Sequence, residues 1–279
     1  MVLRVLAPLT LVALLAVAPP PDVATLRMDP VRDAWLLGGS AVALLGTELF
    51  KDALAPATCR WCDARPDGRD ALNPVDDWGR RITGSLASQA RARTWSNVLG
   101  VGVLPASVLG AQYLVAAGSG SAATFYPDAA IIIESVMLAQ VFNQGVKFAA
   151  GRERPFVHAL APAARRLTEE PADNNLSFYS GHTSFAFSLV AAAGTVAELR
   201  GYSHRWVVWA VGAPIATAIP LLRMGAAKHY LTDVATGAAV GAAFGVGVPL
   251  LLHGRAARPS GAAARLSVGS GGAVLSGQF

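Results

Sequence analysis

Long apolar blocks separated by polar segments dominate the pattern of this chain. After an N-terminal apolar stretch, the blocks occupy residues 34–49, 97–117, 128–148, 183–198, 205–222 and 232–252. Several approach the roughly 20 residues that a helix needs to cross a bilayer. The pattern predicts an all-α, membrane-embedded helical bundle of about five or six spans. The shorter blocks, 34–49 and 183–198, are expected to span, to lie at the interface or to be buried.

The chain divides into four regions on this pattern. Residues 1–21 are predicted to be a signal peptide or an anchor, because a basic start and an apolar stretch precede the small residues Ala16-Val17-Ala18. An N-terminal helix and a polar loop fill 22–96, with an amphipathic helix expected around 77–94. The main helical core covers 97–252. The Gly/Ser/Ala-rich tail, 253–279, is predicted to be flexible or to form a short hairpin.

Composition agrees with a membrane protein. The chain is 53% hydrophobic and 15% charged, whereas a soluble domain carries about 25% charged residues. The formal net charge of +5 favours anionic lipids or phosphorylated substrates, or reflects arginines that set the topology. No basic patch interleaved with aromatic residues is present, so no nucleic acid partner is expected.

The two cysteines, Cys59 and Cys62, form a lone Cys-x-x-Cys pair. A zinc site would need two further ligands, and no second Cys/His pair lies nearby in the sequence. The pair is therefore interpreted as a local disulfide outside the cytoplasm or as two inert thiols.

The first of three polar clusters consists of Lys147 and the pair Arg154-Pro155. A spacing of seven residues is two helical turns, so both cations are expected on one face at a helix end. Pro155 disfavours helical geometry at Arg154, where the helix is predicted to stop. Taken alone, such cations are usually snorkelling anchors.

The second cluster is Ser180-Gly181-His182, directly before the block that begins at Thr183. A Ser-Gly turn at a helix start exposes backbone N–H groups to an anion, although a capping serine is the simpler interpretation. His182 is placed to donate a proton to a leaving oxygen.

The third cluster contains Arg223, His229 and Asp233. The histidine and the carboxylate are four residues apart, so they are expected on one helical face. A carboxylate there can hold one imidazole N–H and leave the other nitrogen as a nucleophile. In isolation, such a pair is more often a structural hydrogen bond.

Alternation of the last four blocks across a bilayer would bring all three clusters to the same side. Cations, histidines and a carboxylate gathered there suit phosphoryl transfer, because the cations can neutralise the phosphoryl oxygens without a metal. The non-catalytic alternative is an ion-pair network at the membrane face.

These motifs resemble the signature of the PAP2 (phosphatidic acid phosphatase type 2) superfamily, K-x6-RP, PSGH and SR-x5-H-x3-D. Two positions depart from it, since Tyr179 stands for the proline and Leu222 for the serine. The resemblance implies a phosphoric monoester hydrolase in which His229 forms a phosphohistidine, Asp233 orients it, and His182 protonates the leaving group and then activates water. It implies no cofactor and no metal, with phosphate held by Lys147, Arg154, Ser180, Gly181 and Arg223.

The substrate suggested by an active site among apolar helices is a lipid phosphate of the phosphatidic acid, phosphatidylglycerol phosphate or polyprenyl pyrophosphate class. The alternatives are an acid phosphatase or vanadate-type haloperoxidase acting on soluble substrates, and a non-catalytic phosphate-binding or transport membrane protein. The resemblance to bacterial members implies an inner (cell) membrane location with the site facing the periplasm.

Residues outside the motifs receive weaker predictions. Glu134 is interpreted as a hydrogen-bonded packing residue in preference to a residue of the substrate cavity. The segment 173–178 is assigned no chemistry. His158, His204 and His253 are expected to be loop histidines without partners.

Overall fold

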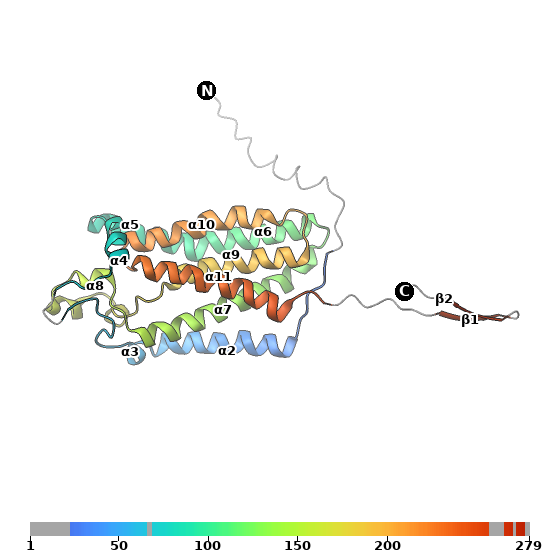
Figure 1. The fold of residues 1–279 in the computed structure, drawn as a ribbon, viewed down its shortest axis with the longest axis horizontal. Coiled ribbons are helices and arrows are strands. Elements are labelled where there is room, and N and C mark those ends of the chain that lie inside the picture. Colours follow the sequence, from blue (N-terminus) through green and yellow to red (C-terminus); the bar gives the residue numbers. More distant parts are fainter. Residues whose placement is uncertain (1–22, 66–68, 257–264, 270–271, 277–279) are drawn as a thin grey trace, which may run out of the picture.

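The computed structural model describes residues 23–65, 69–256, 265–269 and 272–276 (Figure 1). The predicted signal or anchor segment, 1–21, lies outside the described residues. The long helices are α2 (Pro30–Leu49), α5 (Leu86–Asn97), α6 (Leu104–Gly118), α7 (Phe125–Ala150), α9 (Gly181–Arg200), α10 (Trp206–Gly225) and α11 (Leu231–His253). Short helices are α3 (Lys51–Leu54), α4 (Pro74–Gly79) and α8 (Pro155–His158), and in the tail β1 (Arg265–Gly269) pairs antiparallel with β2 (Gly272–Ser276).

The last four apolar blocks form α7, α9, α10 and α11, and Figure 1 shows them running alternately in opposite directions along one bundle. Helix α9 packs against α11, α7, α10 and α6, and most of its side chains are buried. The short block 183–198 is therefore the central helix of the bundle.

The N-terminal half adds two details to the sequence pattern. Helix α2 begins at Pro30, before the apolar block 34–49, because the Asp29 side chain caps it and proline suits its first turn. The polar segment 51–96 contains helix around 77–94, as expected, but the range is divided between α4, a 3₁₀ turn at Arg80–Ile82 and α5. Helix α5 continues through a π-helical segment, Val98–Val103, into α6.

Membrane embedding agrees with the outer surface of the bundle. In the described part of the chain, four helical stretches are long and apolar enough to cross a membrane: Leu86–Gly118, Ala122–Ala150, Trp206–Gly225 and Leu231–His253. Helix α2 lies beside α7 and exposes Trp35, Val42 and Leu45, which suits a lipid environment. The fold is thus an all-α, membrane-embedded bundle, and the predicted number of five or six spans is approximate.

Helices α9 and α11 approach each other along a line of glycines. A Cβ added at Gly237, Gly241 or Gly245 would lie 2.7, 2.4 or 2.5 Å from a backbone carbonyl oxygen of α9. Any side chain there would collide with the α9 backbone, so only glycine permits this distance. The contact fixes the relative position of His182, in the first turn of α9, and Asp233, in the first turn of α11.

Candidate active site

All three sequence clusters lie at one end of the bundle, where α4, α5 and α8 are also found (Figure 1). Helix α7 ends there, α9 begins there, α10 ends there and α11 begins there. Gly151, with φ +55°, terminates α7 before Arg154. The helix therefore stops earlier than the proline predicted, and Arg154 has extended backbone geometry.

His229 lies in the connection between α10 and α11 and is buried. Its Nδ1 is 2.8 Å from the carbonyl oxygen of Ser177. Because a carbonyl oxygen only accepts hydrogen bonds, Nδ1 carries the proton and Nε2 is left with a free lone pair. The backbone thus selects the tautomer that a nucleophile needs.

Asp233 acts on His229 less directly than predicted. Its Oδ2 lies 3.7 Å from His229 Nδ1, beyond hydrogen-bond distance. The same oxygen accepts hydrogen bonds from Ser177 Oγ at 2.5 Å and from Tyr230 N at 2.9 Å. Asp233 therefore holds Ser177, whose carbonyl group holds the imidazole.

The environment of His229 keeps its imidazole neutral. Burial lowers its pKa well below the ordinary value, and the charges of Arg154, Arg223 and Lys147 lower it further. These electrostatic effects also show that the motif cations surround one point. A neutral imidazole among cations is suited to attack an anionic phosphoryl group, which the same cations attract.

Arg152, which the sequence motifs do not include, supports this arrangement. Its side chain is fully buried, and its guanidinium donates to Asp233 Oδ1 and to Asp76 Oδ2, both at 2.7 Å, and to Asp63 Oδ2 at 2.9 Å. Burial alone would lower its pKa, but Asp233, Asp76 and Asp63 raise it above the ordinary value. The arginine therefore joins the loop after α3 to the first turn of α11.

Aromatic rings complete the surroundings of this guanidinium. Its Cζ lies 4.1 Å from the centroid of the Trp61 ring and 4.2 Å from that of Tyr230, distances typical of cation–π contacts. Sequence reasoning missed Arg152 because its carboxylate partners are some 80 residues away along the chain. The available signal was an additional arginine inside the first motif.

Two of the predicted phosphate-binding residues, Lys147 and Gly181, lie close together. A Cβ at Gly181 would lie 3.1 Å from Lys147 Nζ, so the missing side chain leaves room for the ammonium group at the start of α9. Ser180 Oγ accepts from Thr183 N at 3.4 Å and from Thr183 Oγ1 at 3.0 Å. Ser180 is thus the cap of α9, and its contact with phosphate stays a prediction.

The two arginines of the motifs differ in how they are held. Arg154 donates from Nε to the Asp173 carbonyl oxygen at 2.7 Å, and its Nη2 lies 3.3 Å from Asp173 Oδ2. Arg223 Nη1 donates to Ser96 Oγ at 3.3 Å, whereas its buried Nε has no acceptor among the described residues. An unsatisfied buried guanidinium N–H suits an anionic ligand.

Two polar residues outside the predicted site, Asn97 and Asp173, contact motif residues. His182 Nε2 is 2.9 Å from Oδ1 of Asn97, at the end of α5, so this amide orients the imidazole. Asp173 also accepts from Lys51 Nζ at 2.7 Å. Burial alone would raise the pKa of Asp173, but Arg154 and Lys51 outweigh it and lower the pKa below the ordinary value.

A cavity of about 830 Å³ opens beside the cluster. Its walls combine the cations Arg80, Arg93 and Lys228 with apolar side chains such as Leu86 and Phe156. Burial lowers the pKa of Lys228 to about 8, and the charges of Arg154 and Arg93 contribute. Neither His182 nor His229 lines this cavity, so it adjoins the motif cluster without enclosing it.

The segment after α3 packs onto the site through its backbone. Cys59 and Cys62 form a disulfide, which confirms the covalent pairing expected in the first of the two alternatives. Next to them, Arg60 N donates to the Gly151 carbonyl oxygen at 3.0 Å, and Glu153 N donates to that of Trp61 at 3.1 Å. The disulfide-bonded loop is therefore held against the connection between α7 and α8, which carries Arg154.

The prediction of partnerless loop histidines is wrong for two residues. His158, at the end of α8, lies 3.1 Å from Glu153. His253 is buried in the last turn of α11 and contacts Glu134. Neither histidine is three or four residues from its partner, so helical periodicity did not reveal the pairs.

Comparison with known proteins gives a family and a distant structural likeness. The model of the PAP2 superfamily matches residues 128–256, which include all three motifs. Among solved structures, the chain resembles the crystal structure of the first transmembrane PAP2 type phosphatidylglycerolphosphate phosphatase from Bacillus subtilis. The TM-score is 0.44 and the identity 15%, over 75% of this chain and 93% of that chain. No curated protein matches the chain.

Proposed function

Because the chain belongs to the PAP2 superfamily, we propose that it is a metal-independent phosphatase that removes phosphate from a membrane lipid. The observation that carries the proposal is the state of His229. Its imidazole is buried and neutral, its Nδ1 proton is donated to the Ser177 carbonyl oxygen, and three motif cations act on it. This combination provides a nucleophile and attracts its substrate.

The reaction proceeds in two displacements. His229 Nε2 attacks phosphorus, the bond from phosphorus to the lipid oxygen breaks, and His182 donates a proton to the leaving oxygen. His182 then removes a proton from water, whose oxygen attacks the phosphohistidine. The P–N bond breaks, and inorganic phosphate leaves. Lys147, Arg154 and Arg223 neutralise the phosphoryl oxygens in both steps.

A lipid substrate is supported by the position of the site. The motif cluster lies at the end of a bundle of membrane-spanning helices, where a lipid phosphate at the bilayer surface can reach it while the acyl chains stay in the membrane. The adjoining cavity offers cations and apolar side chains to the rest of such a molecule. The class comprises phosphatidic acid, phosphatidylglycerol phosphate and polyprenyl pyrophosphate.

The orientation is supported by the disulfide. Disulfides persist in oxidising compartments such as the periplasm and are rare in the cytosol. The Cys59–Cys62 pair lies in the loop that packs on the site. We therefore infer an inner (cell) membrane enzyme whose active site faces the periplasm.

Phosphate release from the three lipid classes tests the proposal, with wild type compared to His229→Ala and His182→Ala in detergent micelles. His229→Ala is expected to lose at least about 10³-fold in turnover, because no other group forms the covalent intermediate. His182→Ala is expected to lose about 10²–10⁴-fold. His204→Ala, at the opposite end of the bundle, is the control and should retain full activity.

Three outcomes would contradict the proposal. Unchanged phosphate release by His229→Ala rules out the phosphohistidine. Equal rates on a water-soluble phosphomonoester count against the lipid substrate, and phosphate binding without turnover favours a binding or transport role. The sidedness is tested in intact spheroplasts with a soluble lipid phosphate that does not cross the membrane. Hydrolysis only after lysis would overturn the periplasmic orientation.

A further inference from the structure

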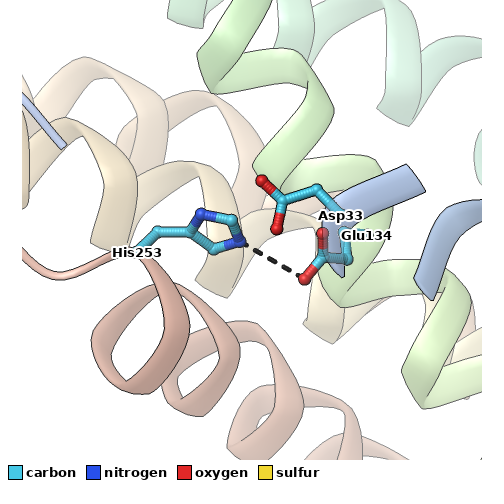
Figure 2. Close-up of side chains that lie close together, drawn as sticks. All are labelled: Asp33, Glu134 and His253. Atoms are coloured by element: carbon cyan, nitrogen blue, oxygen red, sulfur yellow. Dashed lines mark hydrogen bonds and ion pairs between the residues drawn. The ribbon is translucent and has the colours of Figure 1, made fainter. Parts of the chain in front are cut away.

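A second cluster of chemically reactive side chains lies at the other end of the bundle. Asp33 from α2, Glu134 from α7 and His253 from α11 point toward one another in Figure 2. One ligand atom of each, a carboxylate oxygen or an imidazole nitrogen, lies within 4.8 Å of the others, and all three residues are buried. None of them belongs to the PAP2 motifs or touches the phosphate cluster.

The position of the proton on the His253 ring shows why the cluster needs a further positive charge. Its Nδ1 lies 3.0 Å from the carbonyl oxygen of Arg27, so Nδ1 carries a proton. Its Nε2 lies 3.3 Å from Glu134 Oε1. Without a further positive charge, a nitrogen lone pair would face a carboxylate in a buried site. The arrangement therefore calls for a cation between these atoms or a proton on one of them.

The separation of Glu134 and His253 fits a metal ion. Two ligands at about 2.0–2.2 Å from a tetrahedral ion are about 3.3–3.6 Å apart, which includes the 3.3 Å between Glu134 Oε1 and His253 Nε2. Metal-bound histidine usually donates its other N–H to a carbonyl or carboxylate oxygen, as His253 does to Arg27. Asp33 is likewise oriented from outside the cluster. Its Oδ2 accepts from Asp29 N at 3.0 Å, and its Oδ1 is paired with Arg32, whose Nε and Nη2 donate to it at 2.9 and 2.7 Å.

We propose that Asp33, Glu134 and His253 bind a divalent transition-metal ion of the Zn²⁺ type. An imidazole with two carboxylates is a ligand set for zinc and its neighbours, whereas Ca²⁺ and Mg²⁺ prefer oxygen ligands alone. The ion has a structural role, because it is remote from the catalytic histidines. It fastens α2, which packs beside α7 and faces lipid, to the end of α11.

The experiment uses the full chain in detergent, freed of any affinity tag and treated with a chelator. After equilibration with Zn²⁺ and removal of excess metal, elemental analysis is expected to find one zinc per chain. Zn²⁺ should raise the Tm by several degrees, since it binds only the folded state. Glu134→Gln keeps the side-chain shape and removes a ligand charge, so it should lose both the bound zinc and the Tm shift.

Glu198→Gln is the matched control, because it removes an exposed carboxylate at the same end of the bundle. It should keep the zinc and the shift. If Glu134→Gln does not fold, Asp33→Asn and His253→Gln provide the same comparison. The proposal is overturned if the wild type retains no zinc and shows no shift, which would leave a shared proton, or if Glu134→Gln binds zinc equally well. Neither measurement depends on phosphatase activity.

Discussion

The two ends of the bundle use the same histidine geometry in opposite electrostatic environments. At one end His229 Nδ1 donates to the Ser177 carbonyl oxygen at 2.8 Å, and at the other His253 Nδ1 donates to that of Arg27 at 3.0 Å. Cations surround the first imidazole and carboxylates the second. Of the carboxylates at the second end, Asp33 is paired with Arg32. In the two proposals above, the neighbouring charges select an anionic substrate at one end and a cation at the other.

Carboxylates do occur at the motif end of the bundle, where Arg152 forms ion pairs with three of them. Arg152→Met tests how much these ion pairs stabilise the fold. Removing the guanidinium leaves Asp63, Asp76 and Asp233 buried without their partner, so a loss of about 3–5 kcal/mol in unfolding free energy is expected. Thermal and denaturant unfolding in detergent measure it.

The control for this variant is Arg81→Met, which replaces an exposed arginine in the 3₁₀ turn that follows α4. It should stay within about 0.5 kcal/mol of wild type. Arg152→Lys is expected to fall between the two, because an ammonium group cannot form the same fork. Equal stability of Arg152→Met and Arg81→Met would show that the carboxylates do not need Arg152.

The sequence predicted one part of this architecture well. The apolar blocks predicted α7, α9, α10 and α11 to within a few residues, because membrane-spanning helices are determined by long local patterns. The same alternation placed the motif residues at one end. These features depend on the local sequence and on whether the number of spans between two motifs is odd or even. Both can be read from a single sequence.

Contacts across polar segments could not be predicted in this way. Asp63, Asp76 and Asn97 approach the site from a region without hydrophobic periodicity. Glu134 and His253 are 119 residues apart. Helical spacing brought His229 and Asp233 to within 3.7 Å of each other. It could not decide that the imidazole takes the Ser177 carbonyl oxygen as its hydrogen-bond acceptor.

The glycine contact between α9 and α11 connects the two halves of the catalytic end and provides the next test. Gly241→Ala places a Cβ at 2.4 Å from the Ser184 carbonyl oxygen, so the helices must separate. A loss of about 1–3 kcal/mol in unfolding free energy is expected. Turnover should fall as well, because His182 is carried by α9 and His229 is held at the start of α11.

Gly247→Ala is the matched control, since nothing lies within 4 Å of a Cβ at that position of the same helix. It is expected to be neutral or to stabilise the helix by up to about 1 kcal/mol. If both variants behave alike in unfolding and turnover, the close approach does not position the catalytic histidine.

The smallest expected effect concerns the field that the cations impose on His229. Burial lowers its pKa, and Arg154, Arg223 and Lys147 lower it further, so Nε2 stays unprotonated as the pH falls through about 6.5, the ordinary value for histidine. The acid limb of kcat/KM that belongs to His229 should thus lie below that pH. Arg154→Gln removes one cation, raises the pKa and moves the limb to higher pH, by about one pH unit or less.

The pH dependence of the Tm should change for the same reason. A histidine whose folded pKa is lowered contributes stability above its unfolded pKa, and this contribution is lost as the pH falls below that value. Arg154→Gln should therefore reduce the acid sensitivity of the Tm, whereas Arg205→Gln, at the opposite end, should leave both profiles in place. The readout is the pH at which the acid limb lies, because the maximal kcat/KM also falls when Arg154 no longer contacts phosphate. An unmoved limb in Arg154→Gln would mean that the catalytic cations do not set the protonation of His229, and the electrostatic contrast between the two ends would lose its functional meaning.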